Sequence, residues 1–285
     1  RINTNLGVCW SMKKIAVCIS GLVRYWEETY PLFEHWNNLY DDVEFVFFLA
    51  TWKGIDLWYE EERFGKLELT EHDYSKYDFL EDYIKMDPSD VDFNLRTDKP
   101  NINYMSYAIK EVQKLRRNSK HKFDGVIQTR NDALIHNSNI LDTCVNLVRN
   151  KQYFYNDDTF FTSESLSIQR EFIKENPYKL ILQQDNFYFG TPIAIDKFSK
   201  MYDMTFIDGD ITSRACHFTP AEHIYKQGLT SIKIRGFPLL LRDGKIIKQG
   251  RPTPEIMRYL IQEKGVEWIY NQPLDKLMNE YFTYE

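Results

Sequence analysis

The stretch KIAVCISG, residues 14–21, decides the fold. It is a short apolar run that ends at a glycine, which is typical of a buried strand in a parallel sheet. A second run of this kind, VEFVFFLA, covers residues 43–50, and the apolar positions of residues 26–40 between the two have helical spacing. The order strand, helix, strand predicts a parallel sheet with a right-handed crossover, and therefore an α/β protein.

The middle of the chain continues this alternation. Residues 104–117 predict an amphipathic helix, and residues 123–129 (FDGVIQT) predict a strand that delivers Arg130, Asn131 and Asp132 at its carboxyl end. A further helix is expected over residues 139–149. Residues 56–100 are charged and mixed, so short helices and loops are expected there, and residues 151–180 show no clear pattern.

The boundaries are sharper in the last third of the chain. Thr191, Thr219 and Thr253 each precede a proline, which predicts an N-cap followed by a proline in the first helical turn. Residues 219–222 also spell a capping box, and Gly265 is a good terminator for the last of these helices. Residues 239–247 contain Asp-Gly between apolar runs, which predicts a β-hairpin.

These elements predict one domain over residues 12–285, with a nucleotide-binding part at about 13–135 and an acceptor part at about 136–285. Residues 1–11 precede Met12, so we expect them to be an upstream or expression-derived extension and Met12 to be the natural start.

Composition excludes several classes of protein. The net charge of −6 argues against nucleic-acid binding, which needs a basic face. The four cysteines have no CxxC spacing, which implies neither a zinc site nor a disulfide framework, so reduced thiols and a cytoplasmic location are expected. No run approaches the length of a membrane span. The sequences GxxxxGK[ST], GxGxxG, HExxH and GxSxG do not occur.

Three polar clusters lie next to predicted strands. Ser20, Gly21 and Arg24 come directly after the first strand, where open α/β sheets bind ligands, and Arg24 can offer a fork of N–H groups to a phosphate. The alternative is an ordinary strand-to-helix turn. Asp132 is a candidate ligand for Mn²⁺ or Mg²⁺, with Arg130 as an alternative source of positive charge. A lone aspartate after a strand also suits a turn or an N-cap.

The third cluster surrounds Asp185, between amides and the run Phe187–Gly190. This carboxylate is a candidate general base on a sugar hydroxyl, or alternatively a strand-entry residue bound by backbone amides. Trp52 and Tyr188 are candidate platforms for stacking on a sugar.

Taken together, several segments resemble a GT-A-type glycosyltransferase family and are similar to WavE-type lipopolysaccharide-synthesis proteins and related phage and viral proteins. The matching segments are KKIAVCISGLVR (13–24), Thr51-Trp52, FDGVIQTRND (123–132), DNFYFGTPIAIDKFSKMY (185–202) and TPAEHIYKQGL (219–229). The family pattern SG-x-x-R falls on Ser20, Gly21 and Arg24, and R-x-D falls on Arg130 and Asp132. D-[QN]-F-x-F-G begins at Asp185, and P-[AE]-E ends at Glu222.

The resemblance implies a GT-A-like, Rossmann-like, mostly parallel central sheet flanked by helices. It also implies a nucleotide-sugar donor, for which we expect a UDP-sugar, and transfer to a hydroxyl of a glycan or lipopolysaccharide-type acceptor. Asp185 or Glu222 would bind the acceptor hydroxyl, while a role for Glu222 within the capping box is the alternative. The predicted location is the cytoplasm of a bacterium, or of the host cell if the protein is viral.

One departure from the family concerns the metal. GT-A enzymes carry D-x-D, whereas here the strand ends in Arg130-Asn131-Asp132, and one carboxylate is a weaker divalent site than two. Asp208 and Asp210 form a displaced D-x-D, and His217 is a candidate late ligand, although a lone histidine is more often structural. A non-catalytic nucleotide- or glycan-binding protein with a degraded GT-A fold is therefore the alternative function, and a structural or interaction protein is a third.

Overall fold

The structure is a computed structural model that describes residues 12–53, 72–91, 101–136, 140–151, 155–162, 165–166, 182–183, 187–211, 218–233, 239–241 and 252–282. Asp185, His217, the Asp243-Gly244 turn and residues 1–11 lie outside the described residues, so the predictions made for them are not tested. No helix within the described ranges is long and apolar enough to cross a membrane.

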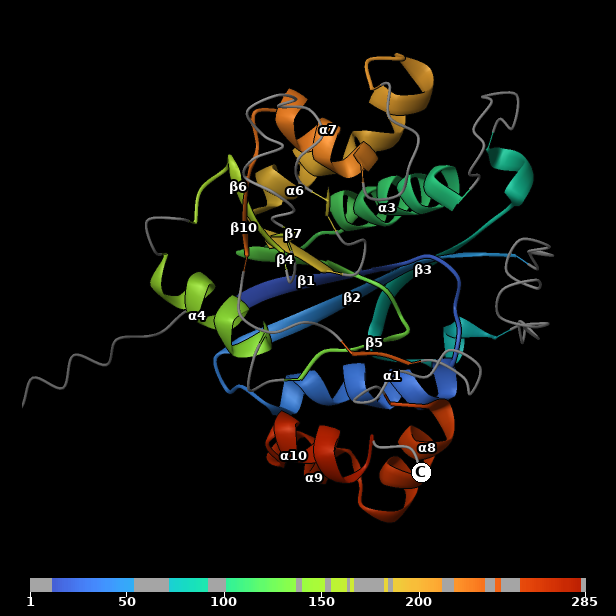
Figure 1. Ribbon diagram of the computed structural model, residues 1–285, viewed down its shortest axis with the longest axis vertical. Helices are drawn as coiled ribbons and strands as arrows, with labels where there is room; N and C mark the ends of the chain where they lie inside the picture. Colours follow the sequence, from blue (N-terminus) through green and yellow to red (C-terminus); the bar gives the residue numbers. More distant parts are fainter. Residues whose placement is uncertain are drawn as a thin grey trace, which may run out of the picture.

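The main sheet is mostly parallel (Figure 1). Among the described residues it has seven strands in the order β10-β6-β9-β4-β1-β2-β3. The parallel pairs are β1 with β2, β1 with β4, β2 with β3, and β6 with β10, whereas β9 runs antiparallel to both β4 and β6. The strands of this sheet are β1 Lys13–Ser20, β2 Val43–Trp52, β3 Leu80–Met86, β4 Gly125–Thr129, β6 Thr159–Thr162, β9 Phe187–Gly190 and β10 Thr230–Lys233.

Two short antiparallel pairs accompany the main sheet. They are β5 (Ala133–Leu134) with β11 (Leu239–Leu240), and β7 (Ser165–Leu166) with β8 (Leu182–Gln183). The first strand of the predicted hairpin is thus β11, and it pairs with β5. The rest of that hairpin lies outside the described residues.

Helices cover both faces of the sheet. The α-helices are α1 Trp26–Glu34, α3 Asn101–Asn118, α4 Asp142–Asn150, α6 Pro192–Ser199, α7 Phe218–Lys226, α8 Pro254–Glu263, α9 Val266–Asn271 and α10 Leu274–Glu280. Short 3₁₀ segments are η1 His35–Asn38, η2 Tyr74–Lys76 and η3 Pro88–Asp90, and a π-helical turn, η6, spans Asp203–Ile207.

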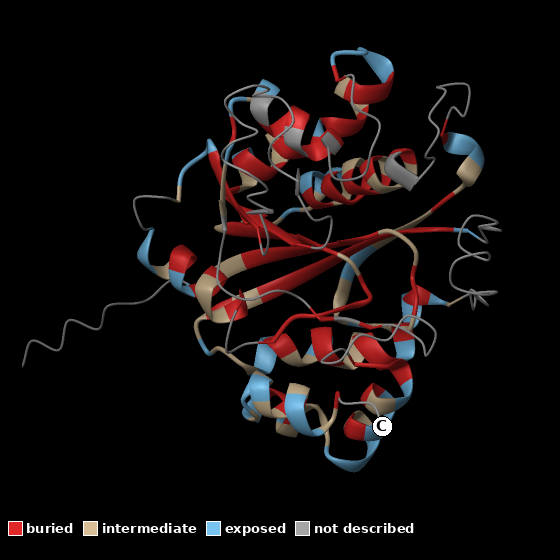
Figure 2. Cartoon of the chain, in the orientation of Figure 1, coloured by how far each residue is buried: buried red, intermediate tan, exposed pale blue. Residues whose placement is uncertain are grey.

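Alternate residues of the strands serve two separate cores. Ile15, Val17 and Ile19 of β1 pack with α1, α4 and the C-terminal helices, on what we call the α1 face. Ala16 and Cys18 pack with α3, α6 and α7, on what we call the α3 face. Figure 1 shows these helix layers on opposite sides of the sheet, and Figure 2 shows that its central strands are buried. The α/β class and the mostly parallel sheet predicted from the sequence are thus confirmed.

Two strands contradict the expectation for their regions. β3 lies within residues 56–100, where only helices and loops were predicted, and β6 lies in a region without a pattern. β3 forms one edge of the sheet and pairs only with β2 among the described strands, so its charged sequence LEDYIKM stays mostly half-exposed and shows no apolar run. β6 has only four residues, TFFT, which is too short for a periodicity to show.

Two of the three predicted helix starts are confirmed. Thr191 accepts a hydrogen bond from the amide of Ala194, and Thr253 accepts one from Ile256, each at 3.2 Å. The N-cap and capping box predicted at Thr219 are wrong, because α7 already includes Phe218 and Thr219. Gly265 has φ +86° and its amide donates to Leu260 at the end of α8, as predicted for a helix terminator.

Candidate functional site

The carboxyl ends of β1, β2 and β4 lie at one edge of the sheet. Ser20 of β1 is paired in register with Ala50 of β2, and Ile19 is paired with Thr129 of β4. The antiparallel strand β9 begins at this edge, with Phe187 opposite Thr129. The polar segments that follow β1 and β4 therefore start side by side, as the sequence predicted.

The segment after β1 has an unusual backbone. Gly21 has φ +112°, a conformation that L side chains rarely adopt, and a Cβ there would meet no described atom within 4 Å. Gly21 is thus a glycine because of its backbone conformation and not because of crowding. Its amide donates to the carbonyl of Ala50 at 3.1 Å. The amide of Gly21 is therefore committed to the sheet and is not free to bind a phosphate.

The turn ends in a second residue with positive φ. Tyr25 has φ 54° just before α1, which costs a non-glycine residue roughly 1–2 kcal/mol. The first turn of α1 holds this residue, because the Tyr25 carbonyl accepts from the Glu28 amide and from the Thr29 hydroxyl. Such backbone strain is typical of segments that present groups to a ligand.

The segments after β1 and β4 are tied together by Asn131. Its side-chain amide donates to the carbonyl of Arg24, and both residues are buried. This bond connects the two predicted motifs directly, so SG-x-x-R and R-x-D form one structural unit.

Arg130 and Asp132 form a two-pronged ion pair. Arg130 Nε donates to Asp132 Oδ1 at 2.8 Å, and its terminal nitrogen donates to Oδ2 at 2.7 Å. Asp132 is 1% exposed, whereas Arg130 is half-buried. Paired arginine and carboxylate planes of this kind are geometrically specific, so the buried carboxylate orients the guanidinium at the rim of the sheet.

The described residues of this edge do not form a donor set that fits a divalent cation. Both oxygens of Asp132 accept from Arg130, whose positive charge lies where a cation would bind. Among the residues that the structure describes, no three His, Cys, Asp or Glu side chains cluster as metal ligands. Asp208 and Asp210 are exposed and flank Gly209 at φ +72°, which is the geometry of a turn.

Glu222 lies on α7 and is buried. Its carboxylate pairs with Lys226 one turn later, with Oε1 and Nζ 3.1 Å apart. α7 packs against β8, which precedes Asp185 in the sequence by two residues. Asp185 lies outside the described residues, so the structure does not test whether the two candidate acceptor-side carboxylates meet.

The two predicted stacking platforms are core residues. Tyr188 is 1% exposed, with its ring centroid 4.3 Å from that of Phe198. Trp52 is buried against Tyr104 and Tyr107, at centroid distances of 4.9 and 5.8 Å. Stacking of either ring on a sugar is therefore ruled out by their burial.

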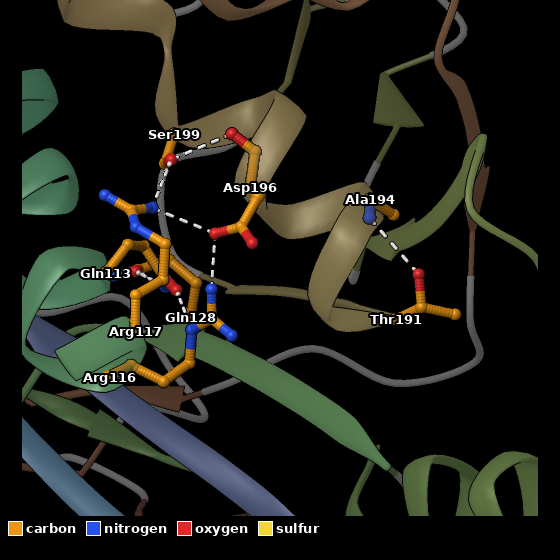
Figure 3. Close-up of polar contacts among 8 residues, drawn as sticks. All are labelled: Gln113, Arg116, Arg117, Gln128, Thr191, Ala194, Asp196 and Ser199. Carbon is orange, nitrogen blue, oxygen red and sulfur yellow. Dashed lines mark hydrogen bonds and ion pairs between the residues drawn. The ribbon is translucent and has the colours of Figure 1, made fainter. Parts of the chain in front are cut away.

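Sequence reasoning missed a set of polar residues beneath this edge on the α3 face (Figure 3). Gln128 of β4 bonds to Ser20 and to Gln113 of α3, and Gln113 bonds to Arg116. Arg116 and Arg117 both reach Asp196 of α6. Both arginines lie in the last turn of α3, and Arg116 is 4% exposed. The polar Gln128 within the apolar strand GVIQT was the available signal.

Cys18 lies in the same layer but is not a reactive thiol. Burial raises its pKa to about 12, against smaller lowering effects of Arg116 and of a hydrogen bond from Gln113. At neutral pH it is a protonated side chain that fills the core.

The fold and this edge define an α/β protein with arginine, serine and carboxylate groups at the carboxyl ends of adjacent parallel strands. No protein-family model and no curated protein matches the chain. Among solved structures, the chain is similar to the galactosyltransferase LgtC in complex with donor and acceptor sugar analogs. The similarity covers 77% of this chain and 73% of that chain, at 12% identity and a TM-score of 0.38. At so low a TM-score, the likeness establishes neither the fold nor the activity.

Proposed function

We propose that the protein is a glycosyltransferase that moves a sugar from a nucleotide-sugar donor, a UDP-sugar, to a hydroxyl of a glycan or lipopolysaccharide-type acceptor. The observation that carries this proposal is the joining of two motifs at one sheet edge. Ser20, Gly21 and Arg24 follow β1, Arg130 and Asp132 follow β4, and Asn131 bonds the two segments together. Open α/β sheets bind nucleotides at this edge, and the resemblance to WavE-type proteins rests on the same residues.

Arg24 and Arg130 are the residues we propose for the departing nucleoside diphosphate. Negative charge grows on the diphosphate as the bond to the sugar breaks, and fixed guanidinium groups stabilise that charge. Asp132 acts on this step through Arg130, which it holds by two hydrogen bonds. In this role Asp132 is a positioning residue and needs no metal ion.

Asp185 and Glu222 are the residues we propose for the acceptor. One of the two carboxylates would bind the acceptor hydroxyl and, in an inverting reaction, take its proton. The contact of α7 with β8 supports a common location. We also propose that the domain has a nucleotide-binding part at about 13–135 and an acceptor part at about 136–285.

A non-catalytic nucleotide- or glycan-binding protein is the second candidate. The observation that favours it is the ion pair of Asp132 with Arg130, because a carboxylate held in this way is not part of a D-x-D metal site. Calorimetric titration with UDP-sugars, combined with an assay for UDP release, separates the two functions. A binding protein gives heat without UDP release.

The test of the enzymatic proposal is Asp132→Asn, assayed by UDP release from the preferred UDP-sugar. The variant keeps the shape of the side chain but loses the charge that orients Arg130, and turnover is expected to fall at least ~10²-fold. Asp208→Asn is the matched control, because Asp208 is an exposed carboxylate, and it should retain wild-type turnover. Full activity of a folded Asp132→Asn protein would refute the assignment.

The screen that precedes this test is a thermal-shift series of nucleotide sugars with and without Mn²⁺. Binding at ~100 times the dissociation constant adds ~2.7 kcal/mol to stability, so a true donor raises the melting temperature measurably. The unfavourable donor set around Asp132 predicts that Mn²⁺ adds little to this shift.

A further inference from the structure

A continuous line of hydrogen bonds runs beneath the sheet edge from α6 to Ser20. Arg116 contacts Asp196 and donates from Nε to Gln113 Oε1 at 2.7 Å. Gln113 Nε2 donates to Gln128 Oε1 at 2.8 Å, and Gln128 Nε2 donates to Ser20 Oγ at 2.8 Å. We call these four residues, Arg116, Gln113, Gln128 and Ser20, the relay, and Figure 3 shows its inner members beside Asp196.

The direction of every bond in the relay follows from Arg116. A guanidinium has five N–H donors and no acceptor, so the Gln113 atom that faces it must be the carbonyl oxygen. The amide nitrogen of Gln113 then faces Gln128 and requires its carbonyl oxygen, which turns the amide nitrogen of Gln128 towards Ser20. Either amide in the flipped orientation would set donor against donor, so the chemistry of one arginine determines both amides.

Within the relay, the Ser20 hydroxyl acts as an acceptor, so its hydrogen can be donated to another group. Its oxygen accepts from Gln128, and among the described residues it has no other hydrogen-bond partner. The hydroxyl hydrogen is therefore not used by any described residue, and Ser20 is the last residue of β1, at the carboxyl edge of the sheet. Ser20 is 8% exposed, so a ligand at this edge would meet a hydroxyl that is already oriented as a donor.

Packing alone does not account for this arrangement. Burying amides and a guanidinium costs free energy unless all are hydrogen-bonded, and apolar side chains would fill the same layer at no such cost. The ion pair of Arg116 with Asp196 is complete without the two glutamines. Their additional effect is to extend a fixed polarity from α3 to Ser20.

We propose that Arg116 is a positioning residue that, through Gln113 and Gln128, holds the Ser20 hydroxyl as a hydrogen-bond donor to a phosphoryl oxygen of a nucleoside diphosphate. The identity of the ligand rests on the proposed function, whereas the direction of the relay rests on the hydrogen bonds alone. Ser20 is the group that touches the ligand, and the other three residues act through it.

The test is calorimetric titration of the protein with UDP in four forms: wild type, Ser20→Ala, Gln128→Glu, and the two changes combined. Loss of a hydrogen bond to a charged phosphate weakens binding roughly tenfold, so Ser20→Ala should show this loss. Gln128→Glu replaces the donor by a carboxylate, which draws the Ser20 hydrogen away from the ligand and should weaken UDP by a similar factor.

The combined variant distinguishes positioning from a structural or charge effect. If Gln128 acts through Ser20, adding Gln128→Glu to Ser20→Ala weakens UDP no further. An equal additional loss in the Ser20→Ala background overturns the proposal, and so does wild-type affinity of Gln128→Glu.

Arg116→Lys keeps a side chain that donates hydrogen bonds and accepts none, so it should bind UDP more tightly than Arg116→Met. Lys114→Gln on the same helix, 60% exposed at its side chain, should bind as wild type.

A separate measurement keeps the relay testable if the wild-type protein binds no nucleotide, an outcome that would refute the proposed function alone. Ser20→Ala leaves the side-chain amide of Gln128 with the Thr129 carbonyl, at 3.4 Å, as its described acceptor, and Gln128→Met removes that amide. The melting temperature of the double variant should therefore be higher than the sum of the two single shifts predicts. Additive shifts would mean that the two residues are not coupled and would overturn the relay.

Discussion

On β4, Ile127 faces the α1 face and Gln128, one residue later, faces the α3 face. The α1 face is packed with aromatic rings, among them Phe33, Trp36 and Phe47, whose centroids lie 5.3 to 6.2 Å apart. The α3 face contains the polar side chains of the relay, which are buried as the rings of the α1 face are. Adjacent residues of one strand thus serve two cores of different chemistry.

The difference in polarity between the two cores indicates which side of the sheet supports the candidate site. An apolar core needs only volume and shape, and the α1 face is mostly of this kind, although Trp36 donates a buried hydrogen bond to Tyr270. A buried polar chain costs stability unless it is fully paired, and departures of this kind from local rules are expected at functional sites. On the α3 face, this buried polar chain is the relay, which ends at Ser20 on the edge that also carries Arg130.

The largest effect on stability is expected from replacing two neighbouring aromatic residues of β2. Phe47 faces α1 and Phe48 faces α3, and both are fully buried. Replacing either by alanine should destabilise the protein by about 3–5 kcal/mol, with Phe47 at the upper end because it contacts Phe33, Trp36 and Phe79. Urea unfolding of both variants measures the difference. A clearly larger loss for Phe48→Ala would contradict the view that the α1 face carries more of the packing energy.

The next effect concerns pH and a histidine of the α3 face. Burial lowers the pKa of His223 to about 4, while its Nε2–H donates to the Lys197 carbonyl at 3.0 Å. Above about pH 6.5 the residue is neutral in both states and stability does not depend on it. Between about pH 6.5 and 4 the unfolded chain binds the extra proton, so this residue lowers stability by up to ~1.4 kcal/mol for each unit that the pH falls.

The variant His223→Gln keeps a donor for the carbonyl and removes the titration. Urea unfolding at pH 7, 6 and 5 should show a smaller acid loss in the variant than in the wild type. His136, near the α1 face, also has its pKa lowered by burial, and His136→Gln provides the comparison. Identical pH slopes for the wild type and His223→Gln would disprove the assignment.

The smallest effect compares helix caps on the two faces. Thr253 caps α8 on the α1 face and Thr191 caps α6 on the α3 face, each at 3.2 Å from the capped amide. Thr253→Ala should cost about 1 kcal/mol of unfolding free energy. Thr191→Ala should cost somewhat more, because this hydroxyl also donates to Asp157 at 2.8 Å. The corresponding serine variants should restore most of the stability, since serine retains the capping oxygen.

Prediction succeeded where the pattern is local and strong. The apolar runs of β1 and β2, the amphipathic face of α3 and the threonine-proline starts of α6 and α8 were all predicted and are confirmed. Prediction failed for β3, whose charged sequence reflects an edge position that depends on the rest of the sheet. It also failed for Trp52 and Tyr188, because an aromatic ring that stacks on a ligand and one that fills a core have the same sequence pattern.

The sequence by itself determined the α/β class, the edge at which the polar segments lie and the residue types found there, because strand periodicity and connection handedness are local properties. Tertiary structure decided how those residues pair. The fork of Arg130 on Asp132 depends on side-chain geometry, and the relay joins residues from β1, α3 and β4 that meet only when the strands pair and α3 packs on them. Hydrogen bonds act over a few ångströms, so their partners are specified by the fold and not by distance along the chain.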